Sequence, residues 1–221
     1  MNFKLNNILS FSLILIPPFL ISGPLISELL MLISISIFLY LVIKNKNFIY
    51  FKNKYTYFFI LFFIFINLRS LFVSDLILSM KSTFFYFRFY LLSLSIWYVL
   101  DTNYKFGKKY LNIFIISLII LIIDAFIQYK FGVNIFGMTK THPDRISSFF
   151  GDELVLGSYL VRWLPLTIGL YVFIHFKKFN FKNTIVLFSI ILLMYSGIAI
   201  SGDRTAFYLS LLFLPFLFTL K

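Results

Sequence analysis

Long apolar runs that alternate with short lysine-rich loops dominate this sequence of 221 residues. An α-helix of about 20 apolar residues spans the hydrocarbon core of a bilayer. Hydrophobic residues make up 61% of the chain and charged residues only 13%, whereas a soluble domain carries roughly a quarter charged residues. We therefore predict an all-α, polytopic membrane protein that forms a single transmembrane domain over residues 1–221. About eight transmembrane helices are expected, near residues 8–22, 25–43, 55–73, 83–100, 110–128, 153–174, 184–200 and 205–220.

The positions of the lysines predict how these helices are oriented. If eight helices alternate, most lysines fall in loops on one side of the membrane, where Asp101 is the only acidic residue. The positive-inside rule makes that side cytoplasmic, together with the N-terminus. The net charge of +12 is then explained by loops beside anionic lipid headgroups. Membrane lipids are expected partners and nucleic acid is not.

All five arginines, in contrast, fall on or toward the extracytoplasmic side: Arg69, Arg88, Arg145, Arg162 and Arg204. Lysine is the common cation of this chain, so a retained arginine suggests a task that lysine performs poorly. The usual task is two-pronged binding of phosphate or carboxylate. The alternative is that arginines near helix ends simply extend toward lipid headgroups. For Arg69 and Arg88 both interpretations stay open.

Arg162 is harder to explain by headgroup contact. If Asp152 caps the sixth helix, Arg162 lies about 15 Å along it, near the middle of a ~30 Å hydrocarbon core. We then expect its helix face to pack inward or to line a cavity. An ion pair with an acid such as Asp124 is one interpretation, and a cation facing a ligand is the preferred one. The same small or polar face carries Val155, Ser158, Pro165 and Gly169.

Two helices are predicted to begin on the outer side with similar turns, Gly151-Asp152-Glu153 and Ser201-Gly202-Asp203-Arg204. Each offers a glycine, a capping aspartate and free backbone N–H groups. Two helix N-termini near arginines predict an anion-binding site. The alternative is that Asp152 and Asp203 only cap their helices.

Other candidate site residues are few. Asp124 and Gln128 lie one turn apart near the outer end of the fifth predicted helix, where they could contact a substrate or hydrogen-bond a neighbouring helix. The chain has no cysteine, and its two histidines, His142 and His175, are predicted on opposite sides. We therefore expect no metal site and no cofactor.

Several of these segments resemble bacterial O-antigen ligases and O-antigen polymerase-like proteins. Arg145-Ile-Ser-Ser-Phe-Phe-Gly-Asp-Glu, followed by Gly157-Ser-Tyr-Leu and Leu164-Pro-Leu, is similar to the loop-to-helix segment of that family. Ser201-Gly-Asp-Arg-Thr-Ala resembles its second characteristic turn. The stretches Lys81–Phe89 and Asp124–Gly137 fit the same pattern, so the resemblance covers residues ~65–210.

The resemblance implies a helical glycosyltransferase of the bacterial inner membrane. Such enzymes move an undecaprenyl-diphosphate-linked glycan to lipid A-core or to another glycan at the periplasmic face. It implies that Arg145, Arg162 and Arg204 bind the diphosphate, and it assigns no catalytic residue. Family members are longer, so this chain is expected to be the N-terminal part of such an enzyme. A lipid-linked glycan flippase, another transporter and an inactive fragment stay open as alternatives. The expected supporting residues are Arg69, Arg88, Asp124, Gln128, Asp152, Glu153 and Asp203.

Overall fold

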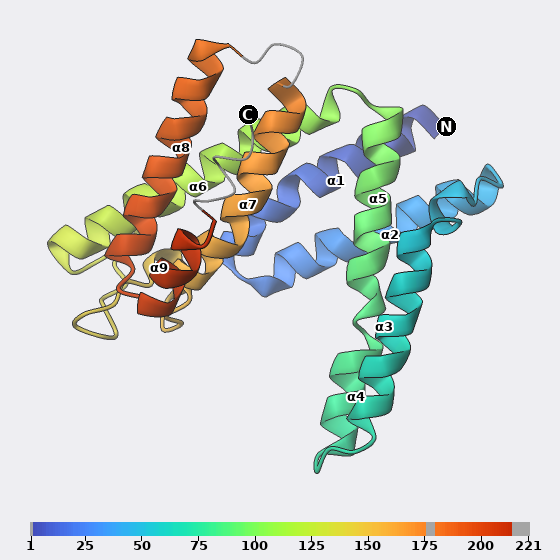
Figure 1. Ribbon diagram of the computed structural model, residues 1–221, viewed down its shortest axis with the longest axis horizontal. Coiled ribbons are helices and arrows are strands. Elements are labelled where there is room, and N and C mark those ends of the chain that lie inside the picture. Colours follow the sequence, from blue (N-terminus) through green and yellow to red (C-terminus); the bar gives the residue numbers. More distant parts are fainter. Residues whose placement is uncertain (1, 176–179, 214–221) are drawn as a thin grey trace. The chain divides into compact units, whose positions relative to one another are not determined.

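The computed structural model describes residues 2–175 and 180–213, and their regular structure is helical (Figure 1). Two short 3-10 turns, Ile49–Phe51 and Ser148–Phe150, accompany the α-helices. The prediction of an all-α fold is therefore confirmed. The α-helices are α1 (Asn2–Ser22), α2 (Pro24–Lys44), α3 (Lys54–Ser70), α4 (Leu76–Phe84), α5 (Phe87–Thr102), α6 (Phe106–Phe131), α7 (Leu156–His175), α8 (Phe181–Ile200) and α9 (Arg204–Leu211).

Six helical stretches among the described residues are long and apolar enough to cross a membrane, not eight. They are α1 from Lys4, α2, the continuous stretch Leu76–Thr102 that joins α4 to α5, α6, α7 and α8. The helix α3 has 17 residues, about 25 Å, which is shorter than a ~30 Å hydrocarbon core. The last predicted span, 205–220, runs beyond the described residues. The structure thus supports a multi-pass membrane protein with six candidate spans.

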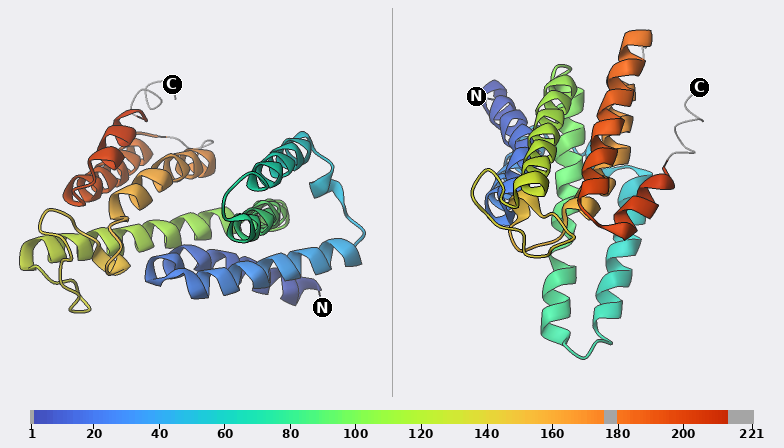
Figure 2. Two further views of the ribbon diagram at one scale, coloured as in Figure 1. Left: turned by 90° about the horizontal axis from the view of Figure 1, so that it is seen from below. Right: turned by 90° about the vertical axis from the view of Figure 1, so that its left-hand side faces the viewer.

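The helices form two compact units, residues 1–16 with 25–106 and residues 17–24 with 107–221. In the first unit, α3 runs antiparallel beside α4 and α5 (Figure 2). The hydroxyl groups of Thr56 and Tyr90 hydrogen-bond at 2.5 Å, and the rings of Phe59 and Tyr90 stack with centroids 4.3 Å apart. The fully buried ring of Phe38 lies at the centre of an aromatic cluster in this unit.

The core of the second unit lies between α6, α7 and α8. Gly197 of α8 lets the helices approach closely, because a Cβ atom there would lie 2.8 Å from Leu160 Cδ1 and 3.0 Å from Ile122 Cγ1. The buried apolar residues come from all three helices. They include Phe114, Leu118, Leu121, Ile122, Leu156, Leu160, Leu164, Ile191, Met194 and Ile198.

One end of the second unit collects most of its irregular backbone, and we call it the loop end. It comprises the last two turns of α6, the connection 132–155, the first turn of α7 and residues 198–206, which end α8 and begin α9. Figure 1 shows this connection in yellow, close to the start of α9. The opposite end of the same helices carries Lys108, Lys109 and Lys182.

Candidate functional site

Asp124 and Gln128 hold the connection 132–155 from inside the unit. Both side chains are fully buried, on successive turns of α6. One carboxylate oxygen of Asp124 accepts the backbone N–H of Ile135 at 2.8 Å, and the other accepts the Ser148 hydroxyl at 2.6 Å. The carboxylate is thus engaged by the loop, so an ion pair between Asp124 and Arg162 is not formed.

Gln128 fixes the same loop at a strained point. Its side-chain oxygen accepts the backbone N–H groups of Ser147 at 3.2 Å and Ser148 at 2.7 Å. Ser148 has φ of 54°, a conformation that residues other than glycine rarely adopt. Such strain persists only where surrounding contacts over-determine it. Asp124 and Gln128 supply those contacts, so both residues position the loop.

The two segments that carry the family resemblance meet at the loop end. The N–H of Ile146 donates to the carbonyl of Ser201 at 3.2 Å. A Cβ atom on Gly157 would lie 2.5 Å from Ser201 Oγ and 2.6 Å from Asp203 Cβ. Gly202 has φ of +69°, and a Cβ there would lie 2.2 Å from the backbone oxygen of Asp144. Glycine at both positions is what allows this close approach.

Arg145 joins the starts of α7 and α9. Its Nη2 donates to the carbonyl of Leu154 at 3.0 Å and lies 3.7 Å from Asp203 Oδ2. Its Nε atom is buried without a hydrogen-bond partner. Arg145 therefore lies within the loop end and faces the aspartate of the second segment.

Asp203 caps α9, as its sequence pattern predicts. Its Oδ1 accepts the Thr205 hydroxyl at 2.7 Å and the Ala206 N–H at 3.3 Å. Burial alone would raise the pKa of this carboxyl. The hydrogen bonds from Thr205 and Ala206 and the charge of Arg145 outweigh burial, and they hold the pKa below its ordinary value. Asp203 is therefore anionic at neutral pH.

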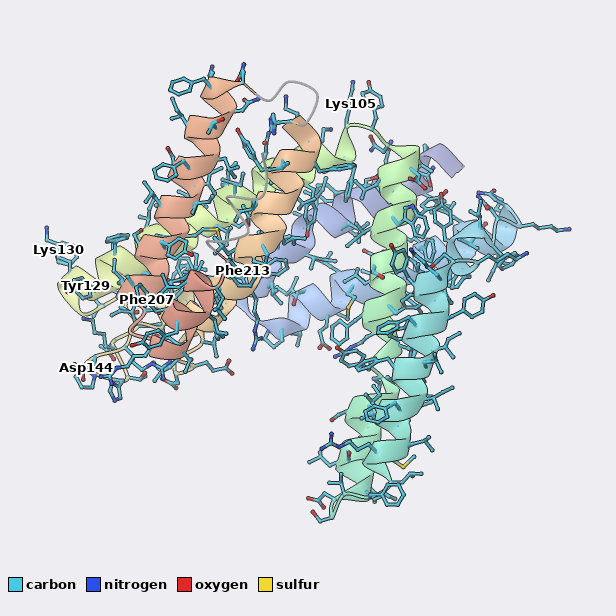
Figure 3. The ribbon with its side chains drawn as sticks, viewed as in Figure 1. Lys105, Tyr129, Lys130, Asp144, Phe207 and Phe213 are labelled. Atoms are coloured by element: carbon cyan, nitrogen blue, oxygen red, sulfur yellow. The ribbon has the colours of Figure 1, made fainter. Side chains whose placement is uncertain are left out.

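Arg204 lines a pocket of about 410 Å³ at the start of α9. Its side chain is exposed. Asp144 and Phe207, both labelled at this end of the unit in Figure 3, line the same pocket together with Tyr208. The pocket thus combines a cation, two acidic residues and two aromatic residues at the junction of the two segments.

Arg162 lies elsewhere on α7 than the sequence suggests. The helix begins at Leu156, so Arg162 is only about 9 Å along it, not about 15 Å. The side chain is exposed and lines a second pocket, of about 430 Å³, beside Tyr159 and Trp163. Its helix face does not pack inward, since Pro165 and Gly169 are exposed as well. The other expectation for this face holds in part, because Val155 and Ser158 line the pocket with Arg162. The packed face holds Leu156, Gly157, Leu160, Val161 and Leu164.

The expected cap of α7 is also absent. Asp152 and Glu153 are exposed and precede the helix, whose first turn contains no acidic residue. Gly151, with φ of 60°, turns the chain, and the helix begins only at Leu156. One of the two predicted capping aspartates, Asp203, therefore caps a helix and the other does not.

Arg69 and Arg88 belong to the first unit. Arg88 makes a two-pronged ion pair with Glu28, with N–O distances of 3.1 and 3.3 Å. Arg69 is exposed in the last turn of α3. The structure therefore gives Arg88 a partner within its own unit.

Sequence reasoning missed Asp144 as a site residue. It is an exposed acidic residue in a loop, and only its contact with Gly202, across more than 50 residues of sequence, reveals that it lines the Arg204 pocket. Among the described residues no group of three or more acidic or histidine side chains could hold a metal ion. Comparisons with protein-family models, with curated proteins and with solved structures found no match to this chain.

Proposed function

We propose that this protein is a membrane glycan transferase of the O-antigen ligase or polymerase type. In this proposal it binds the diphosphate of an undecaprenyl-diphosphate-linked glycan at the loop end. The observation that supports it is the packing of the two resembling segments on each other. Ile146 donates to Ser201 at 3.2 Å, and Arg145 lies 3.7 Å from Asp203. Residues distant in sequence thus form one structure at the positions that the resemblance marks.

The charges at this junction suit a diphosphate. Arg204 is exposed at the first residue of α9 and lines the pocket, so its guanidinium can pair with a phosphate bound there. The leaving diphosphate gains negative charge as the sugar–oxygen bond breaks, so a fixed cation stabilises the transition state more than the ground state. Arg145 pairs with Asp203 and so helps to hold the start of α9 in place. Arg162 supplies a second exposed cation on the same unit.

The proposal places the loop end on the periplasmic side of the inner membrane. Single cysteines at Thr141 and Asp152, both exposed at the loop end, should react with an impermeant maleimide in intact cells. Cysteines at Tyr104 and Lys182, also exposed, should react only after the cells are permeabilised, because the positive-inside rule makes those lysine-rich regions cytoplasmic. Labelling of all four positions from outside would refute this orientation.

Arg204 gives the direct test of donor binding. Arg204→Ala should weaken binding of undecaprenyl diphosphate to the detergent-solubilised protein by roughly 10- to 100-fold, the value of a charged hydrogen bond. Arg204→Lys should recover only part of the loss, because a point charge cannot replace the two-pronged guanidinium. Titration calorimetry at two salt concentrations measures the effect, and wild-type affinity should fall as salt rises.

The matched control is Lys130→Ala, which removes an exposed cation from the last turn of α6. It should leave the affinity nearly unchanged, since Lys130 does not line the Arg204 pocket. Equal losses in Arg204→Ala and Lys130→Ala would show that only overall charge attracts the ligand. Wild-type protein that binds undecaprenyl diphosphate with no salt dependence would refute the proposed site.

A further inference from the structure

The Arg204 pocket contains an acidic residue that a diphosphate does not need. Asp144 lines the pocket and is exposed. The other acidic residue of the pocket, Asp203, uses its carboxylate for the α9 cap and for Arg145. A free carboxylate beside a site for a dianion is unfavourable unless it serves another part of the ligand.

The backbone fixes where Asp144 lies. Its N–H donates to His142 Nδ1 at 3.3 Å within a tight turn, and its carbonyl faces Gly202 so closely that no Cβ atom fits between them. Asp144 is therefore held against the start of α9, on which Arg204 lies, although it comes from a different segment.

We propose that this pocket holds the first sugar of the lipid-linked glycan beside the diphosphate, and that Asp144 binds the hydroxyl groups of that sugar. This inference rests on the proposed function and extends it to the sugar. An ionised carboxylate only accepts hydrogen bonds, and sugar hydroxyls donate them, so the two form charge-assisted bonds. Phe207 and Tyr208 are 39% and 68% exposed and offer ring surface to the apolar face of a sugar.

The pocket then orients its ligand by charge. Repulsion from Asp144 keeps the diphosphate on the side of Arg204, and the sugar occupies the side of Asp144. The same repulsion selects against a sugar that carries a carboxylate of its own. The pocket is expected to prefer a neutral or amino sugar next to the diphosphate and to disfavour a uronic acid.

Three probes test this inference: undecaprenyl diphosphate, undecaprenyl-diphospho-N-acetylglucosamine, and an undecaprenyl-diphospho-uronic acid. The wild type should bind the neutral-sugar probe about tenfold more tightly than the bare diphosphate, the value of one charge-assisted hydrogen bond. The uronic acid should give no such gain. In Asp144→Asn the gain from the neutral sugar should shrink and the discrimination against the uronic acid should disappear. Affinity for the bare diphosphate should stay equal or rise.

Asp75→Asn is the control, because Asp75 is an exposed acid that does not line the pocket; its three affinities should match those of the wild type. Salt-dependent binding of the bare diphosphate without any gain from a sugar would overturn the Asp144 inference and leave the proposed function intact. Discrimination against the uronic acid that persists in Asp144→Asn would also overturn it. A wild type that binds none of the probes would refute both proposals.

Discussion

Replacing Asp124 with alanine is expected to lower the free energy of unfolding by about 3 kcal/mol, through lost hydrogen bonds and a new cavity. The fully buried carboxylate accepts hydrogen bonds from Ile135 and Ser148, and alanine removes both acceptors. The loop should then open more often, so that trypsin cleaves after Lys140 faster than in the wild type. Thermal unfolding in detergent and the rate of this cleavage measure the two effects.

Two further variants serve as comparisons for Asp124→Ala. Asp124→Asn keeps the side-chain volume and one oxygen for the N–H of Ile135, so its loss should be smaller, about 1 kcal/mol. Asn112→Ala changes an exposed polar residue of the same helix and should have little effect. If Asp124→Ala and Asn112→Ala were cleaved at equal rates, Asp124 would not anchor the loop.

Two glycines of α7 should respond to alanine with opposite signs. Gly169 has no atom within 4 Å of a Cβ position, so Gly169→Ala should raise the free energy of unfolding by roughly 0.5–1 kcal/mol through better helix propensity. Gly157→Ala should lower it by about 2 kcal/mol, because the new methyl group overlaps the 201–206 turn. Its Cβ would lie 2.5 Å from Ser201 Oγ and 2.6 Å from Asp203 Cβ.

The Gly157→Ala and Gly169→Ala variants also show whether the packing of α7 on the 201–206 turn matters for ligand binding. Gly157→Ala moves the start of α9 away from α7 and should also weaken binding of undecaprenyl diphosphate, whereas Gly169→Ala should not. Thermal unfolding in detergent and calorimetric titration compare the two variants directly. A shift of equal sign in both proteins would mean that α7 and the 201–206 turn are not in tight contact.

Local patterns predicted most of the helices. Apolar runs of membrane-spanning length are visible in the sequence itself, and α6, α7 and α8 fall within a few residues of their predicted ranges. The cap of α9 was predictable for the same reason, because glycine, aspartate and the first helical residues are neighbours in the chain. The structure supports six of the eight predicted spans as candidates: α3, with 17 residues, is shorter than these six, and the last predicted span, 205–220, runs beyond the described residues.

The errors at the candidate site come from contacts between distant segments. Helical periodicity groups Arg162 with Pro165 and Gly169, but it does not say which face of α7 packs. The 201–206 turn packs against Gly157, about 140° around the helix from Arg162, and so leaves Arg162 exposed. The partners of Asp124 were also invisible, because Ile135 and Ser148 reach it only through the folded loop.

The hydrogen bond between Asp124 and Ser148 also sets an order of events during synthesis. Ser148 lies 24 residues after Asp124, and ribosomes add about 5–20 residues per second. The carboxyl group of a newly inserted α6 therefore waits roughly one to five seconds before the Ser148 hydroxyl, the later of its two partners, exists. An aspartate in the apolar part of a membrane helix opposes insertion. During that interval water, lipid headgroups or the insertion machinery must solvate Asp124, and the helix matures only when the nascent chain has passed Ser148.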